Sequence, residues 1–233
     1  MLFITKNADY PAKNTPGSPR KTVPRMVASE NNPYLRTKSN NRQDMYLFFD
    51  TETTGLPRNW KAPVTNVNNW PRMVQLAWLL YDASGTLLER EDQVIQPDGY
   101  TIPAEAESVH GISTRRAMEE GEDLIVVLSK FEERIQKADY LVAHNMSFDE
   151  KIAGAEFLRV GLHNPIPEKE RICTMTTTTA FCGIEGPYGY KWPRLSELHQ
   201  KLFGEAFEEA HNAAADIQAT GRCFWELRDR GLI

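Results

Sequence analysis

The sequence MYLFFDTETTGL, residues 45–56, joins an apolar run to two acidic residues and a glycine-containing turn. The aromatic and aliphatic side chains of the run favour a buried strand, which we predict over residues 45–51. Asp50 and Glu52 are two residues apart, so in a strand both side chains emerge on the same face. An unpaired charge is costly to bury, and this pair therefore needs a partner of opposite charge.

Two further segments carry acidic residues near the ends of apolar stretches. Asp149 closes HNMSFD (residues 144–149), and HNAAAD (residues 211–216) contains His211 and Asp216. Cations would neutralise such carboxylates, and oxygen ligands favour hard cations such as Mg²⁺ or Mn²⁺. Taken alone, Asp149 could stabilise a helix through its dipole, and His211 could be a cap or a surface residue. Together the segments predict a two-metal phosphodiesterase in which His211 is a candidate general base.

The composition is that of an ordinary water-soluble domain. The chain has 233 residues, 41% of them hydrophobic and 25% charged. Its longest apolar stretches, such as residues 73–81, are far shorter than the roughly 20 residues that a membrane span needs. Three cysteines form no close pair, and the N-terminus lacks a secretory apolar core. We therefore expect reduced thiols, no membrane contact and a cytoplasmic location.

Charge is distributed unevenly along the chain. Residues 1–44 carry eight Lys or Arg and three Asp or Glu, a net charge of +5, which leaves −10 for the remainder of a chain whose total is −5. The first segment is also rich in Pro, Asn and Ser, so we predict a basic, disordered N-terminal arm over residues 1–44. A passive tail and a nucleic-acid-binding arm are equally compatible with it. The acidic body would have to bind nucleic acid locally, with metal ions offsetting its charge.

From residue 45 onward the pattern alternates between strands and helices. Strands are predicted over residues 45–51, 72–81, 86–96 and 140–143, with a hairpin turn at Ser84-Gly85. Helices are predicted over residues 103–109, 114–120, 123–138, 147–160, 194–203 and 212–230. The Pro-, Asn- and Trp-rich loop 57–71 is long enough to have a function. This order indicates a single α/β domain over residues 45–233, a mixed sheet covered by helices.

Taken in order, the three acidic segments resemble the Exo I, Exo II and Exo III motifs of the DEDD exonucleases. HNAAAD has the form His-x-Ala-x-x-Asp, which is similar to the third motif of the histidine-bearing DEDDh branch. That branch includes the proofreading epsilon subunit of bacterial DNA polymerase III, RNase T, oligoribonuclease and the TREX exonucleases. The segment His110-Gly111-Ile112 also resembles a His-Gly-Ile segment of epsilon-like members. The resemblance covers most of residues 45–230 and implies a ribonuclease H-like fold, a mixed five-stranded sheet flanked by helices.

The same resemblance implies a metal-dependent 3′→5′ exonuclease that releases nucleoside 5′-monophosphates. Asp50, Glu52, Asp149 and Asp216 would hold two Mg²⁺ or Mn²⁺ ions, with Asp50 bridging them. His211, whose ordinary pKa is near neutrality, would act as the general base toward the attacking water.

Five further residues are expected to contact the substrate. By resemblance, backbone N–H groups around Thr53 would hold the terminal 3′-hydroxyl, and Leu56 would wedge between the last bases. His110 lies in the matching His-Gly-Ile segment, and Asn145 follows the predicted strand at residues 140–143. Phe148 could carry a base by stacking. A core position for Phe148 and a backbone-capping role for Asn145 remain open alternatives.

The expected partner is a single-stranded or frayed 3′ end of DNA. RNA trimming is the main alternative, because none of the motif residues distinguishes a 2′-hydroxyl from a 2′-hydrogen. A DNA polymerase or repair complex is a further partner class left open by the resemblance. A non-catalytic nucleic-acid or polymerase-binding module is disfavoured, since all five motif positions are filled. A structural protein with a coincidental acidic cluster would have to explain three matching segments in order.

Overall fold

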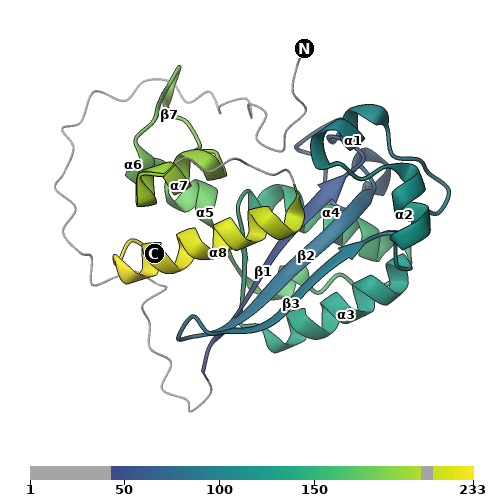
Figure 1. The fold of residues 1–233 in the computed structure, drawn as a ribbon, viewed down its shortest axis with the longest axis horizontal. Coiled ribbons are helices and arrows are strands. Elements are labelled where there is room, and N and C mark those ends of the chain that lie inside the picture. Colours follow the sequence, from purple (N-terminus) through teal and green to yellow (C-terminus); the bar gives the residue numbers. More distant parts are fainter. Residues whose placement is uncertain (1–42, 206–211) are drawn as a thin grey trace.

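A mixed five-stranded sheet forms the centre of the computed structural model, which describes residues 43–205 and 212–233 (Figure 1). The arm expected over residues 1–44 therefore lies outside the described residues except for its last two. The strand order is β3-β2-β1-β4-β5. The strands are β1 (Met45–Thr53), β2 (Met73–Asp82), β3 (Leu87–Val94), β4 (Tyr140–Ala143) and β5 (Glu170–Cys173).

Strand β1 lies in the middle of the sheet and joins its two halves. It is antiparallel to β2, with Asp50 opposite Ala77 and Glu52 opposite Gln75. It is parallel to β4, with Phe48 opposite Val142. Strands β2 and β3 are antiparallel, whereas β4 and β5 are parallel. The expected mixed sheet with α/β architecture is confirmed.

Helices and short turns cover the sheet and close its ends. The helices are α1 (Ala104–His110), α2 (Thr114–Glu120), α3 (Leu124–Lys137), α4 (Met146–Arg159), α5 (Thr174–Thr177), α6 (Thr179–Cys182), α7 (Leu195–Phe203) and α8 (Ala213–Asp229). Two 3-10 turns, η2 (Val67–Asn69) and η3 (Ile166–Glu168), lie in the loops. A two-stranded hairpin, β6 (Glu185–Gly186) with β7 (Gly189–Tyr190), stands apart from the sheet. The described helices include none that is long and apolar enough to cross a membrane.

The alternation of side chains along β1 separates two hydrophobic cores. Leu47 and Phe49 face a core that includes residues of α3 and α4. Tyr46 and Phe48 face the opposite core, which includes residues of α7 and α8. Because side chains alternate along a strand, Asp50 and Glu52 continue the series of Tyr46 and Phe48 and lie on the α8 side. The strand therefore delivers both carboxylates to the face on which α8 packs.

Several short elements of the fold were not predicted from the sequence, among them the helices α5 and α6, strand β5 and the hairpin β6–β7. Strand β5 has only four residues, and two of them, Glu170 and Arg171, are exposed, so it shows no apolar run. The hairpin β6–β7 has two residues in each strand, below the length at which a periodic pattern can be recognised. Strand β1 also extends to Thr53, two residues beyond the predicted end, so that Glu52 as well as Asp50 is part of the strand.

The three cysteines are free thiols, as expected. Burial raises the pKa of the Cys223 thiol to about 12, and burial likewise raises the pKa of Cys182. A thiol that stays protonated at neutral pH is a poor nucleophile and a poor metal ligand. Both side chains therefore act as small apolar residues of the core beneath α8.

Candidate active site

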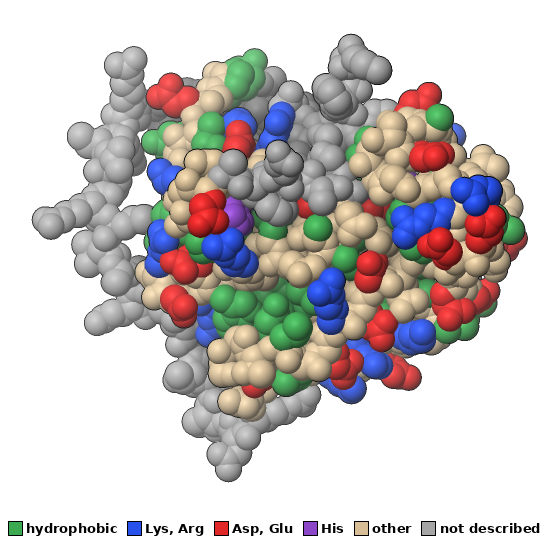
Figure 2. Space-filling view, viewed as in Figure 1, with side chains coloured by type: hydrophobic (Ala, Val, Ile, Leu, Met, Phe, Trp, Pro, Cys, Tyr) green, Lys and Arg blue, Asp and Glu red, His purple; other side chains and the backbone are tan. Residues whose placement is uncertain are grey.

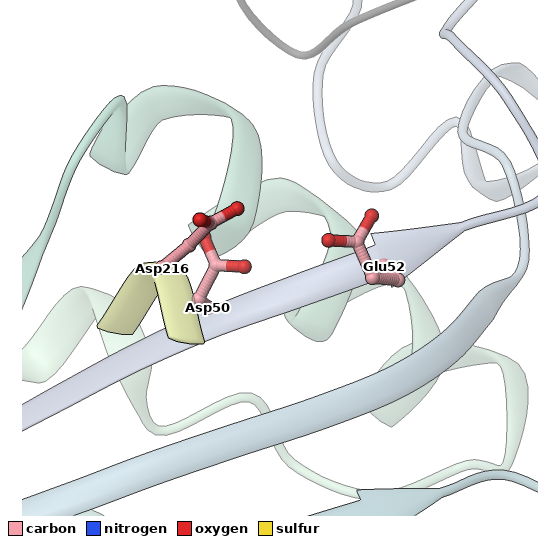
Figure 3. A group of neighbouring side chains, drawn as sticks. All are labelled: Asp50, Glu52 and Asp216. Carbon is pink, nitrogen blue, oxygen red and sulfur yellow. The ribbon is translucent and has the colours of Figure 1, made fainter. Parts of the chain in front are cut away.

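Three carboxylates from two elements meet at the carboxyl end of β1. One carboxylate oxygen from each of Asp50, Glu52 and Asp216 lies within 4.8 Å of the other two (Figure 3). Asp50 and Glu52 come from β1 and are 8% and 5% exposed, whereas Asp216 lies in the first turn of α8 and is half-buried. Three negative charges at this separation repel one another strongly in a partly buried site. A bound cation would remove that repulsion.

The start of α8 is held against the sheet by polar contacts. The Asn212 side chain caps the helix, because its Oδ1 accepts hydrogen bonds from the N–H groups of Ala214 and Ala215 at 3.0 and 3.4 Å. The N–H of Ala213 donates to Oε1 of Gln75 on β2, at 3.3 Å. The small side chains of Ala213 and Ala214 are buried, which lets the helix approach β1 and β2 closely. These contacts set the height of Asp216 above the sheet.

Asp149 enters the same region from the opposite face of β1. Its Oδ1 accepts hydrogen bonds from the N–H of Thr51 at 3.1 Å and from the Thr51 hydroxyl at 2.7 Å. Thr51 stands between Asp50 and Glu52, so the Asp149 carboxylate is tied to the backbone that carries the other two. Asp149 is buried and stands in the first turn of α4. The structure thus groups three of the four expected metal ligands directly and holds the fourth through Thr51.

The expected general base, His211, lies outside the described residues. Its neighbour Asn212 caps α8, which carries Asp216. A second histidine, His144, follows β4 and is buried. Its Nδ1 lies 2.9 Å from the Thr174 hydroxyl and its Nε2 lies 3.1 Å from the carbonyl oxygen of Pro193. Both ring nitrogens are therefore within hydrogen-bond distance of described atoms, so the His144 ring holds the end of β4 against Thr174 and Pro193.

The turn after β1 contains Thr53 and Leu56, two of the expected substrate-binding residues. The Thr53 hydroxyl donates to the carbonyl oxygen of Gly55 at 2.6 Å, and Gly55 has φ of +147°, a conformation that suits glycine. Thr53 is buried, and Leu56 packs partly against the core that contains Phe49. The turn is therefore fixed in place directly beyond Glu52.

The other three expected substrate-binding residues are buried. His110 ends α1, and its Nδ1 accepts a hydrogen bond from the N–H of Ile112 at 3.1 Å, within a small core under α1 and α2. Asn145 has φ of +72° immediately before α4 and is 2% exposed. The Phe148 ring is buried and lies 5.6 Å from that of Trp60, which favours the core alternative over base stacking. Substrate contact by these residues remains a prediction.

Thr51 and Gln75 are functional candidates that the sequence analysis missed. Gln75 is buried, lies opposite Glu52 and also donates from Nε2 to Asp92 of β3 at 2.6 Å. A polar residue inside the apolar run of residues 73–80 was the available signal, because a buried amide must find hydrogen-bond partners. Thr51 gave a weaker signal, since threonine is common in strands.

The donor set fits hard divalent cations. All four candidate ligands offer carboxylate oxygens, which Mg²⁺ and Mn²⁺ prefer, and the described residues place no thiol among them. Asp50, Glu52 and Asp216 would hold such an ion directly, and the Thr51 contacts keep Asp149 close by.

Comparison with known proteins agrees with this geometry. A family model described as exonuclease matches residues 47–224. The 3′-5′ exonuclease DinG of Bacillus subtilis is 27% identical over 186 residues, which are 79% of this chain and 18% of that protein. The PolC-type DNA polymerase III of Listeria monocytogenes is 31% identical over 183 residues, 78% of this chain and 11% of that protein. The chain thus spans less than a fifth of the length of these two relatives.

Solved structures show the same fold. E. coli exonuclease I in complex with a dA16 oligonucleotide matches with a TM-score of 0.64 at 21% identity, covering 82% of this chain and 42% of that one. The complex of the same enzyme with a dT13 oligonucleotide matches with a TM-score of 0.64 at 23% identity, covering 81% and 42%. The family model spans most of the described sheet and both acidic elements of the carboxylate site. The chain belongs to the exonuclease family.

Proposed function

We propose that this chain is a metal-dependent 3′→5′ exonuclease that acts on single-stranded DNA and releases nucleoside 5′-monophosphates. The observation that carries the proposal is the approach of Asp50, Glu52 and Asp216 to within 4.8 Å of one another. Membership of the exonuclease family supports hydrolysis of nucleic acid. The single-stranded oligonucleotides bound by the E. coli enzyme of the same fold support the choice of substrate.

The chain's own residues would divide the work of phosphodiester hydrolysis. Asp50, Glu52 and Asp216 would bind two Mg²⁺ or Mn²⁺ ions, and Asp149 would complete the ligand set while Thr51 fixes its orientation. When bound, such cations supply Lewis-acid stabilisation of negative charge on the phosphate and activation of water. His211 would accept the proton of the attacking water, a task suited to a neutral imidazole.

The proposal extends to the organisation of the chain and its partners. Residues 45–233 would form the exonuclease domain, and the basic segment 1–44 would add electrostatic attraction to the phosphate backbone. The named PolC relatives place related domains within DNA polymerases, which supports a replication or repair setting for this domain. The turn formed by residues 53–56 would contact the terminal nucleotide, because it is fixed directly beside the carboxylates.

The test is a degradation assay on labelled strands. Purified protein is incubated with 5′-labelled single-stranded DNA and with RNA of the same sequence, in Mg²⁺, Mn²⁺ or EDTA. We expect a ladder that shortens from the 3′ end of DNA, requires the metal and is absent with Asp50→Asn protein. Preferential shortening of RNA would assign the chain to RNA trimming, and no shortening of either strand would overturn the proposal.

A further inference from the structure

We infer that the aromatic hairpin, defined as Tyr188, Tyr190 and Trp192 on and beside β6–β7, binds the single strand leading to the carboxylate site. The inference rests on the proposed function and adds a substrate-binding surface to it. It assigns these residues a stacking role toward the bases of a single-stranded nucleic acid.

The aromatic hairpin carries three exposed aromatic side chains. The exposed fractions are 81% for Tyr188, 53% for Tyr190 and 43% for Trp192. Eight large hydrophobic side chains are exposed among the described residues, and these three are the only aromatic side chains in that set. In Figure 2, hydrophobic side chains are exposed at the tip of this projection, with Lys and Arg side chains nearby. Exposed aromatic side chains do not stabilise the folded state, whereas they are typical of surfaces that bind a partner.

The hairpin has a defined shape that presents these rings. Glu185 pairs with Tyr190 and Gly186 with Gly189, so the connection is a two-residue turn containing Tyr188. A side chain at position 186 would meet the carbonyl oxygen of Gly189 at 3.0 Å, and Gly189 has φ of +120°. Both positions therefore favour glycine. The aromatic residues occupy alternate positions along this segment, with Tyr188 in the turn, Tyr190 on β7 and Trp192 just after it.

A short connection joins the base of the hairpin to the carboxylate site. Pro193 directly follows Trp192, and its carbonyl oxygen lies 3.1 Å from Nε2 of His144. Phe48 on β1 pairs with Val142 on β4, and Asp50 and His144 each lie two residues beyond that pair, with His144 just past the end of β4. Neighbouring strands are about 4.8 Å apart. A strand whose 3′ end reaches Asp50 would therefore pass the base of the hairpin if it ran along this side of the sheet.

The chemistry around the rings suits a nucleic acid. Arg194 is exposed, and its positive charge, which also acts on the nearby Glu197, lies within reach of a phosphate at the surface. Lys191 adds a second positive charge, although it is paired with Glu197 at 2.5 Å. Base–aromatic stacking does not depend on sequence, because every base has a π face. Local stacking with one or two cations also explains how a body of net negative charge could bind a polyanion.

The test separates strand binding from the chemistry at the carboxylates. The variant Tyr188→Ala/Tyr190→Ala/Trp192→Ala is compared with wild type for affinity to oligo(dT) of about 20 nucleotides, measured by fluorescence anisotropy in EDTA. Hydrolysis of thymidine 5′-monophosphate p-nitrophenyl ester in Mg²⁺ reports on the carboxylate site without a long strand. Leu87→Ala/Leu88→Ala, which removes two exposed apolar side chains from β3, is the matched control. Tyr188→Ala/Tyr190→Ala keeps Trp192 and guards against misfolding of the triple variant.

We expect the triple variant to bind oligo(dT) at least about tenfold more weakly, and the double variant at least about fivefold more weakly. Hydrolysis of the ester and the affinity of the Leu87/Leu88 control should stay within about twofold of wild type. Unchanged oligo(dT) affinity would overturn the inference. If the variant instead changed only in self-association, the hairpin would be an interface between copies of this chain, and the inference would be overturned as well. Equal loss of strand binding and ester hydrolysis would overturn it too, because the hairpin would then support the site itself. Absence of ester hydrolysis in wild type would count against the proposed function, while the affinity comparison would still decide this inference.

Discussion

The hydrogen bond from the Thr51 hydroxyl to Asp149 offers a clean test of how the site is held together. Thr51→Val removes the hydroxyl and replaces it with a methyl group of similar size in a buried strand position. The backbone N–H of Thr51 can still donate to Asp149 Oδ1 at 3.1 Å, so the carboxylate loses one of these two contacts. The substitution therefore tests a single interaction.

The expected magnitude follows from the length, burial and charge of that bond. It spans 2.7 Å, is buried and ends on a carboxylate. Hydrogen bonds to charged groups contribute about 1.5–3 kcal/mol to stability. We expect Thr51→Val to lower the free energy of unfolding by about 2 kcal/mol. A misplaced Asp149 should also lower kcat on single-stranded DNA by roughly a hundredfold, since small errors in position are costly in catalysis.

The assay compares two buried threonines. Thr178 is also buried, and its hydroxyl donates a 2.7 Å hydrogen bond, but to the neutral carbonyl oxygen of Thr174. Thr178→Val should therefore cost about 1 kcal/mol in urea unfolding and leave kcat unchanged. If Thr51→Val kept wild-type kcat and lost no more stability than Thr178→Val, the role of Thr51 in positioning Asp149 would be refuted.

Three other predictions test the charges and the base. In EDTA, Asp216→Asn should raise the melting temperature by about 2–4 °C, because it relieves repulsion among three carboxylates; a lower melting temperature would count against this electrostatic account. His211→Ala should reduce kcat by about 10²–10⁴-fold while Mn²⁺ affinity stays near wild type, and near wild-type turnover would remove His211 from the mechanism. Burial alone would raise the pKa of Glu197, but hydrogen bonds from the N–H of Arg194 and from Lys191 bring that pKa below its usual value. Its ionised form thus stabilises the fold at neutral pH and loses that effect as pH falls through the lowered pKa. The difference in unfolding free energy between wild type and Glu197→Gln should be about 1 kcal/mol at neutral pH and vanish in acid; a difference independent of pH would contradict this assignment.

Local patterns account for the parts of the fold and site that could be predicted. The alternation along β1 is contained in nine residues, so the shared face of Asp50 and Glu52 follows from the sequence. The helix predicted over residues 212–230 is likewise found, as α8 with Asp216 in its first turn. That Asp216 would lie near Asp50 and Glu52 was inferred from the order of the three motifs, and the structure gives the distances between them.

The interactions that were not predicted link residues far apart in the chain. Thr51 and Asp149 are separated by 98 positions, and Gln75 and Ala213 by 138. No local period identifies such partners, because a hydrogen bond across the fold depends on register and packing. The same reason explains Phe148, whose burial against Trp60 is set by the loop between β1 and β2. Short elements such as β5 and the hairpin are likewise defined by their neighbours more than by their own residues.

Calorimetric titration of Mn²⁺ into wild-type and Asp216→Asn protein asks directly whether the carboxylate cluster binds metal ions. The carboxylate cluster predicts saturable binding to wild type, with two ions per chain in the proposed mechanism. It also predicts affinity at least about tenfold weaker in the variant, whose fold is checked by circular dichroism. Identical isotherms for the two folded proteins would show that Asp50, Glu52 and Asp216 do not form a metal centre, and the proposed chemistry would fail with them.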